Sequence, residues 1–161
     1  GSTPRSWRVK AESGRYVLDS FALLAYLENE AGADRVTALL TAAQRDEAAI
    51  WISIVNYGEV VYITEREQGL FAAQRVIAAL DQLPMAVVDA DRALTLAAAK
   101  VKAQRSISYA DAFAVALAQW HHAVVLTGDP EFRKVEDLVS VEWLARNAPP
   151  VIPSGSGGQG G

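Results

Sequence analysis

Short runs of apolar residues recur along this chain, and most are followed directly by a stretch whose apolar residues have helical spacing. The runs lie at residues 16–18, 49–52, 85–88, 123–126 and 139–142. They show almost no alternation of apolar and polar side chains, which is typical of strands buried on both faces of a parallel sheet. This order predicts an α/β fold: a mainly parallel central sheet flanked by helices on both faces, in three layers.

Several helix boundaries are also marked in the sequence. Ser53 and Ser108 each precede a helical stretch and are predicted to cap it, and Gly69 is predicted to end the first of these helices. The following helix has an apolar side made up of Leu70, Val76, Ile77, Leu80 and Leu83. Three tryptophans lie in segments of core-like composition: Trp51, Trp120 and Trp143. We expect these apolar side chains to pack inside the domain.

A single folded domain is expected, because 161 residues are enough for one hydrophobic core. We place this domain at residues 15–145. Residues 1–14 are predicted to be a flexible N-terminal arm or a remnant of an expression tag, and they lack the apolar segment of a signal peptide. Residues 146–161 are rich in Pro, Gly and Ser and are predicted to form a disordered tail.

Composition narrows the location and the chemistry. No run approaches about 18 uninterrupted apolar residues, so no membrane association is expected. The absence of cysteine excludes disulfides, thiolate metal sites and thiol nucleophiles, and it favours a cytoplasmic location. The net charge of −4 argues against a broad basic surface for nucleic acid. It is compatible with a nuclease whose carboxylates hold a metal ion that meets the phosphate.

Two acidic residues follow predicted strands. Asp19 comes directly after the first apolar run, and Asp129 follows the run that ends in LTG. Ligands of an open parallel sheet bind at the carboxyl ends of its strands, where both residues are expected. Either aspartate, taken alone, is also well placed as an ordinary helix N-cap, and Pro130 at the first helical position strengthens this interpretation for Asp129.

Two further acids lie within predicted helices. Glu59 shares one helical side with Val55 and Ile63, so its carboxylate is expected beside apolar surface. A glutamate at the edge of a buried face, reaching solvent, explains it equally well. Asp111 stands three residues after Ser108, in the pattern of a capping box, but it shares a helical side with the apolar Val115. Asp111 is therefore expected to lean toward the core.

Taken together, the four acids predict one cation site. They lie at strand ends and early in helices, where a single cleft collects them. Clustered carboxylates without cysteine and with little histidine favour a hard cation, Mg²⁺ or Mn²⁺, bound through oxygen. Such an ion activates water and stabilises charge on a phosphoryl oxygen, so the reaction class expected is phosphodiester hydrolysis.

The segments that carry these acids resemble a known family. LDSFALLAYL, the glutamate in NYGEVVY, SYADAFAVALA and LTGDPEF are similar, in order and spacing, to the four acidic motifs of PIN-domain nucleases, most of all the VapC-type toxins of bacterial toxin–antitoxin pairs. The resemblance extends from Tyr16 to Leu144. It implies a PIN-like fold, Mg²⁺- or Mn²⁺-dependent endoribonuclease activity on an RNA substrate, a homodimer, and a cognate antitoxin protein that blocks the site.

The resemblance also assigns roles to the acids. It makes Asp19, Glu59, Asp111 and Asp129 catalytic. We expect Asp19, Asp111 and Asp129 to bind the metal, while Glu59 positions or deprotonates the attacking water. Ser20 and Thr127 are expected to support the site through their hydroxyl groups. Phe21 departs from the family pattern, in which a small or polar residue is common, and its ring is expected to alter substrate access.

Basic and imidazole side chains have weaker signals. Arg133 and Lys134 follow Asp129 closely and are candidate RNA contacts. The pair His121-His122 lies at a helix end, where neighbouring side chains diverge and the helix dipole favours a cation, so a structural role is preferred. A different class of function stays open: a non-catalytic PIN-like module that binds a partner protein or RNA without cutting it.

Overall fold

The computed structural model describes residues 11–147 of the chain. The predicted N-terminal arm, residues 1–14, and the predicted tail, residues 146–161, fall largely outside this range. Those two assignments therefore stay predictions.

Within the described residues the chain alternates strands and helices, largely as the apolar pattern indicates. The strands are β1 (Arg15–Leu18), β2 (Ala49–Ser53), β3 (Ala86–Val88), β4 (Val124–Thr127) and β5 (Val141–Trp143). The α-helices are α1 (Ser20–Leu27), α2 (Ala33–Gln44), α3 (Ile54–Gln68), α4 (Leu70–Leu80), α5 (Arg92–Gln104) and α6 (Tyr109–His121). A short 3-10 helix, η1 (Pro130–Val135), joins β4 to β5.

All the strand pairs of the sheet are parallel, and the strand order is β3-β2-β1-β4-β5. The predicted fold class is confirmed. β1 is central: Val17 is in register with Trp51 of β2 on one side and with Val125 of β4 on the other. The chain runs outward from β1 through β2 and β3 and then returns to the opposite side of β1. The gap between β1 and β4 is therefore the topological switch point, where open α/β sheets bind ligands.

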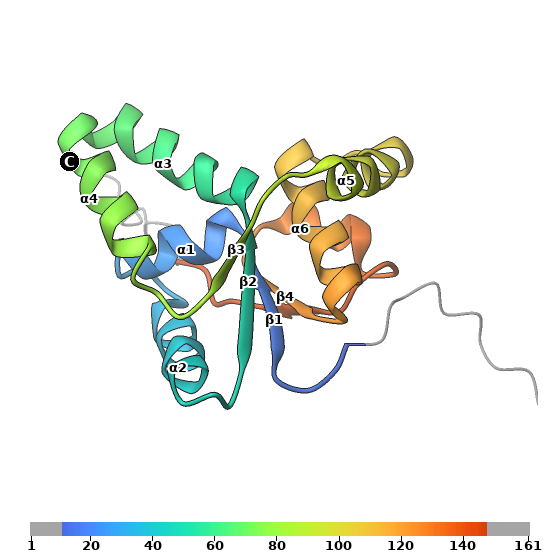
Figure 1. Cartoon of the computed structure of the whole chain (residues 1–161), viewed down its shortest axis with the longest axis horizontal. Helices are drawn as coiled ribbons and strands as arrows, with labels where there is room; N and C mark the ends of the chain where they lie inside the picture. The colour runs from blue at the N-terminus through green and yellow to red at the C-terminus, as the bar shows by residue number, and fades with distance from the viewer. Residues whose placement is uncertain (1–10, 148–161) are drawn as a thin grey trace, which may run out of the picture.

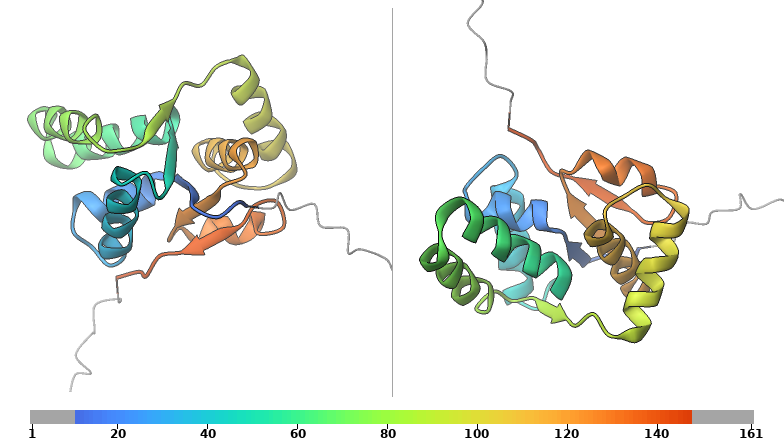
Figure 2. Two further views of the ribbon diagram at one scale, coloured as in Figure 1. Left: turned by 60° about the horizontal axis from the view of Figure 1, so that its bottom comes forward. Right: turned by 90° about the horizontal axis from the view of Figure 1, so that it is seen from above.

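Helices cover both faces of the sheet. Figures 1 and 2 show α1 and α2 on one side of the strands and α5 and α6 on the other. Successive residues of a strand point to opposite faces, so Val17 and Val125 pack in the core beneath α5 and α6, whereas Leu18 and Leu126 pack in the core beneath α1 and α2. Each face of the sheet thus has its own hydrophobic core, and the strand ends are held firmly between them.

The predicted helix boundaries at three positions are confirmed. The side chains of Ser53 and Ser108 accept hydrogen bonds from the backbone N–H groups of Asn56 and Asp111, respectively, and so cap α3 and α6. Gly69 ends α3 and begins α4 with a φ of 95°, a conformation that residues with a Cβ atom rarely adopt. The tight turn folds α4 back along α3, and the resulting hairpin extends past the end of the sheet (Figure 1).

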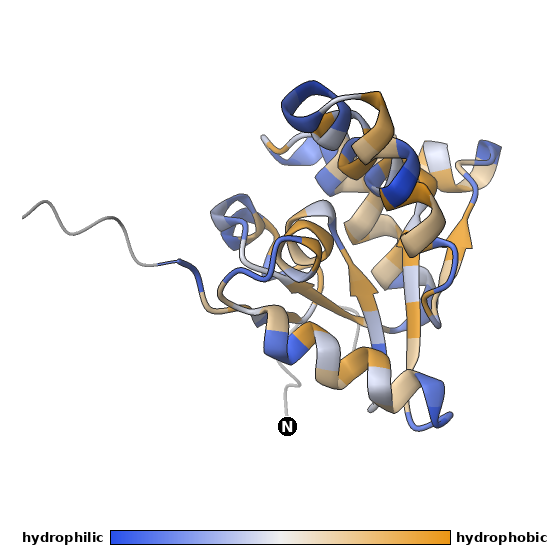
Figure 3. Ribbon diagram, turned by 90° about the vertical axis from the view of Figure 1, so that its left-hand side faces the viewer, coloured by the Kyte–Doolittle hydropathy of each residue, from blue (hydrophilic) through white to orange (hydrophobic). Residues whose placement is uncertain are grey.

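The expectation that all the marked apolar residues are buried is wrong for several of them. On α4, Leu80 is buried, but Leu70 is 62% exposed and Ile77 is 37% exposed. Trp120 near the end of α6 is 45% exposed. Helical periodicity identifies an apolar face but not whether a second element covers it, and α4 stands at the margin of the fold. In Figure 3 apolar residues nevertheless dominate the strands. No helix within residues 11–147 is long and apolar enough to cross a membrane.

Candidate functional site

Asp19 stands at the end of β1, beside the switch point. Its carboxyl group caps α1, because Oδ1 accepts a hydrogen bond of 2.9 Å from the backbone N–H of Ala22. Oδ2 accepts a hydrogen bond of 2.5 Å from the hydroxyl group of Thr127 in β4. The side chain is almost fully enclosed, with the residue 1% exposed. The predicted role of Asp19 as a helix N-cap is confirmed. Capping uses only one of the two carboxyl oxygens of Asp19.

Thr127 joins the first acid to the last. Its Oγ1 donates to Asp19 and accepts a 2.9 Å hydrogen bond from the backbone N–H of Asp129. Asp129 in turn caps η1 by accepting a 2.9 Å hydrogen bond from the N–H of Glu131. A continuous hydrogen-bonded path therefore spans the switch point and ties the carboxyl end of β1 to that of β4.

Glu59 approaches the same region from α3. Ser20, the first residue of α1, donates its hydroxyl hydrogen to Glu59 Oε1. Glu59 is half-buried rather than directed freely into solvent. The two serine and threonine hydroxyls singled out in the sequence each contact one of the acids, Ser20 with Glu59 and Thr127 with Asp19.

Asp111 lies in the first turn of α6. Its backbone N–H donates to Ser108 Oγ at 3.1 Å, so the cap indicated by the sequence is present, yet Asp111 itself is only 5% exposed. A buried residue not anticipated from the sequence, Asn56 of α3, fixes this turn: its Nδ2 donates to the carbonyl of Ala110 at 3.2 Å. The helix that carries Glu59 is thereby joined to the helix that carries Asp111. The feature of the sequence that could have indicated this role is a polar residue, Asn56, within an otherwise apolar part of the helix.

Burial dominates the electrostatics of Asp19. Removal from water raises the pKa of this carboxyl from its ordinary value of 3.8 to about 8. The hydrogen bonds from Thr127 and Ala22 lower the pKa in part, and the charges of Asp111 and Asp129 raise it. Asp19 therefore lies close enough to Asp111 and Asp129 for their charges to influence its pKa.

Asp111 behaves in the same way. Burial raises its pKa to about 7, the charges of Asp129, Glu59 and Glu131 add to the rise, and hydrogen bonding with Ser108 opposes it. Charges influence a pKa in this way when they lie close together, so the structure brings all four predicted acids into one electrostatic neighbourhood. Glu131 is a fifth member that the sequence analysis missed. Its only signal was an acidic residue in the first turn after Asp129.

Among the residues described, Asp19, Glu59, Asp111 and Asp129 form no salt bridge, whereas Glu131 pairs with Lys134. Salt bridges there engage other carboxylates, namely Glu142, Asp137 and Glu131. Burying several like charges is costly unless something compensates them. Oxygen-only donors that repel one another fit a hard divalent cation. In residues 11–147 no three of these side chains form a ready-made ligand cluster, and a cation that retains several water molecules needs few direct protein ligands.

The two candidate RNA contacts have intramolecular partners. The Arg133 guanidinium lies 4.9 Å from the centre of the Trp143 ring. Lys134 Nζ donates to the carbonyl of Ser106 at 2.9 Å and pairs with Glu131 at 3.1 Å. Both side chains are exposed on η1, beside the acids. His121, by contrast, stacks on Trp51 at the opposite end of α6 from Asp111.

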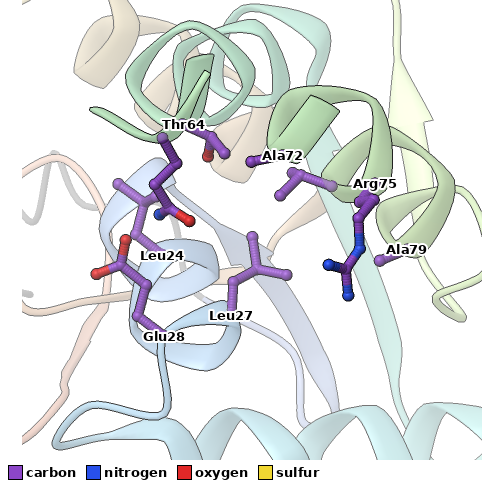
Figure 4. Close-up of a pocket in the computed structure, with 9 residues that line it drawn as sticks. Leu24, Leu27, Glu28, Thr64, Ala72, Arg75 and Ala79 are labelled. Carbon is purple, nitrogen blue, oxygen red and sulfur yellow. The ribbon is translucent and has the colours of Figure 1, made fainter. Parts of the chain in front are cut away.

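A cavity of about 390 Å³ lies between α1 and the α3–α4 hairpin, and none of the four predicted acids lines it. Figure 4 shows Leu24 and Leu27 of α1 facing Ala72 and Ala79 of α4, with Arg75 at its rim. An adjoining cavity of about 250 Å³ shares Leu24 with it and is lined by Phe21. The acid site has the charge expected of a reaction centre, whereas this groove combines apolar side chains with polar ones, a mixture suited to binding a partner.

Comparisons with known proteins agree on the architecture. The model of the PIN domain family matches residues 16–138. VapBC2 from Rickettsia felis, bound to a promoter DNA fragment, is 15% identical with a TM-score of 0.65, covering 81% of this chain and 99% of that one. DNA-bound VapBC from Salmonella typhimurium is 17% identical with a TM-score of 0.63, covering 80% and 96%. VapC20 from Mycobacterium tuberculosis, a toxin that cleaves the sarcin-ricin loop, is 20% identical with a TM-score of 0.56, covering 73% and 92%. No curated protein matches.

Proposed function

The chain belongs to the PIN domain family, and from this premise we propose that it is the toxin of a toxin–antitoxin pair, a divalent-metal-dependent endoribonuclease that acts on RNA in the cytoplasm. The observation that carries the proposal is the pair of buried acids beside the switch point, Asp19 and Asp111, which form no salt bridge among the described residues. Burying these acids costs folding free energy, and a bound divalent cation would compensate that cost.

Each acid has a distinct task in the proposed reaction. Asp19, Asp111 and Asp129 would hold Mg²⁺ or Mn²⁺, which when bound lowers the pKa of water and offsets charge on phosphoryl oxygens. Glu59 would accept the proton of the attacking water, because its side chain is only half-buried, whereas Asp111 is enclosed. Ser20 orients Glu59 through its hydroxyl group, and Thr127 orients Asp19.

The proposed antitoxin would use the groove between α1 and the α3–α4 hairpin. A structure similar to this chain, from Klebsiella pneumoniae, is described as a toxin–antitoxin complex. The groove adjoins the cavity lined by Phe21, and that cavity is edged by Glu28, Glu30 and Glu67. Apolar side chains of a partner segment fit the groove, and its basic side chains fit the acidic edge. A homodimer is part of the same proposal, with the exposed Leu70 and Phe71 of α4 as apolar surface for a second copy.

Cleavage of total RNA tests the catalytic proposal. Purified protein, free of any partner, is incubated with RNA and Mg²⁺ or Mn²⁺, with an EDTA control and the variant Asp19→Asn. Asp91→Asn is a matched control, because Asp91 caps α5 through the same kind of bond, from Leu94 N–H at 2.8 Å, but lies outside the acid group. Discrete cleavage by wild type and Asp91→Asn, lost with EDTA or in Asp19→Asn, is expected. RNA binding without cleavage at any metal concentration would instead favour the non-catalytic module.

A further inference from the structure

The phenyl ring of Phe21 occupies the space where residue 128 would carry a side chain. A Cβ atom at Gly128 would lie 2.3 Å from Phe21 Cε1, 2.6 Å from Cζ and 3.0 Å from Cδ1. Nonbonded carbon atoms pack most favourably about 3.5–4.0 Å apart, so a Cβ atom at this position would clash with the ring. These short distances mean that the ring packs directly on the backbone of Gly128, which is buried. A side chain at position 128 would therefore displace the Phe21 ring from its place.

This contact bridges the loops that carry the first and the last acid. Phe21 is two residues after Asp19, and Gly128 lies between Thr127 and Asp129. The hydrogen bond from Thr127 to Asp19 crosses the same gap. The two strand-end loops are therefore joined twice, once by a polar contact inside the site and once by an apolar contact at its edge.

Phe21 also faces the helix that carries Glu59. Its ring lines the cavity of about 250 Å³ together with Leu24 of α1 and Ile63 of α3. Ile63 is one helical turn beyond Glu59 and on the same side of α3. The Phe21 ring therefore lies between this cavity and the loop that ends in Asp129. At this position it is close to the segments that carry Asp19, Glu59 and Asp129.

We propose that Phe21 is a positioning residue of the metal site, which holds the Thr127–Asp129 loop against the end of β1 by packing into the notch left by Gly128. The inference rests on the proposed function. Glycine gives a backbone more freedom than any other residue, and a group that fills the space around it removes that freedom. Without the ring, the loop is tied to β1 only through Thr127, and Asp129 loses its fixed place relative to Asp19.

A double-mutant cycle with Mn²⁺ alone as the probe tests this role. Calorimetry measures Mn²⁺ affinity for wild type, Phe21→Ala, Gly128→Ala and the double variant, well below each unfolding temperature. Gly128→Ala is expected to weaken Mn²⁺ binding about tenfold or more, the range typical of residues that support metal ligands. The double variant is expected to bind Mn²⁺ more tightly than Gly128→Ala, because the new methyl group then has room. Phe21→Ala alone is expected to weaken binding by a smaller factor.

Gly58→Ala is the matched control. Gly58 adjoins Glu59, yet a Cβ atom there would meet nothing within 4 Å. Its Mn²⁺ affinity should equal that of wild type. Wild-type affinity in Gly128→Ala, or losses that simply multiply in the double variant, would overturn the inference while leaving the nuclease proposal intact. A wild type that neither binds Mn²⁺ nor cleaves RNA would overturn both. If Gly128→Ala fails to fold, the comparison of Phe21→Ala with Phe21→Leu decides, with weaker binding expected for alanine.

Discussion

The two ends of the central sheet differ in whether their charged side chains have partners within the chain. At the amino end, Arg15 Nε donates to the carbonyl of His121 at 2.6 Å, and the Arg15 guanidinium lies 4.7 Å from the centre of the Trp51 ring, which stacks on His121 at 4.2 Å. The Arg15 cation thus has its partners within the chain. At the carboxyl end, Asp19 and Asp111 are buried close to other acids, and burial raises their pKa values to about 8 and about 7.

This difference separates a structural cluster from a reactive one. Both ends combine charged and polar side chains with apolar surroundings, and sequence inspection draws attention to both, through His121 and through the acids. Only the carboxyl end buries carboxyl groups, those of Asp19 and Asp111, that form no salt bridge within the described part of the chain. Uncompensated burial destabilises a protein, so its presence indicates a ligand that supplies the missing charge.

The largest expected effect is the loss of cleavage in Asp111→Asn. Removing one of the proposed metal-binding carboxylates should lower the cleavage rate on the order of 10³-fold, because the group contributes several kcal/mol of stabilisation to the transition state. The unfolding temperature of the metal-free protein should not fall at neutral pH, since the variant has no buried charge. Cleavage kinetics and thermal unfolding measure the two effects, and full activity in the presence of metal would sink the assignment.

The stability of the metal-free protein should depend on pH. Folded Asp19 keeps its proton up to about pH 8, whereas in the unfolded chain it loses the proton near its ordinary pKa of 3.8. The folded state therefore binds more protons between these values, and stability must fall as pH rises through this window. Asp111 adds to the decline up to about pH 7. Unfolding temperatures in EDTA should fall by about 5–10 °C from pH 5 to pH 8, and Asp19→Asn should flatten the curve. A rising curve would contradict the cited shifts.

Thr127→Val should weaken metal binding without abolishing it. The variant removes the hydroxyl that donates to Asp19 and accepts from the Asp129 N–H. Because that hydrogen bond lowers the Asp19 pKa, its loss makes the carboxyl still harder to ionise. Mn²⁺ affinity measured by calorimetry should fall about 10–100-fold. Thr127→Ser keeps the hydroxyl and should retain most of the affinity; an equal loss in both variants would point to packing instead.

A substitution at the amino end should show the reverse pattern. Trp51→Ala removes the ring that contacts both Arg15 and His121. The substitution should lower the free energy of unfolding by about 2–3 kcal/mol, which is less than the usual cost of removing a fully buried tryptophan side chain. Cleavage at a temperature where the variant is folded should be unchanged. A large drop in cleavage by folded Trp51→Ala would mean that the two ends of the sheet are coupled.

Lys134→Met should have the smallest effect on stability. Its ion pair with Glu131 is exposed, and such pairs contribute about 0.5 kcal/mol. If Lys134 is also an RNA contact, as the sequence suggests, the variant should raise the KM for RNA while leaving kcat unchanged. Steady-state cleavage kinetics separate the two contributions, and an unchanged KM would exclude the RNA contact.

The sequence predicts the sheet and the strand-end acids because both depend on local patterns. Apolar runs without polar alternation mark buried strands, and an acid after such a run marks the carboxyl edge of the sheet. Contacts between distant segments have no such pattern. The packing of Phe21 on Gly128 arises only because β4 lies beside β1 in the sheet. Trp120 is exposed because no other element covers its side chain near the end of α6 within the described residues. Glu131 escaped notice because an acid in a first helical turn has an ordinary explanation in the helix dipole.

Titration of metal-free protein with Mn²⁺ by calorimetry at pH 7 is the most direct test that these acids form one cation site. Wild type and Asp91→Asn should bind, and repeating the titration in buffers of different ionisation enthalpy should reveal proton release, because Asp19 is largely protonated at this pH before the cation binds. Asp19→Asn should bind far more weakly and release fewer protons. Equal Mn²⁺ affinity in Asp19→Asn and wild type would contradict the account.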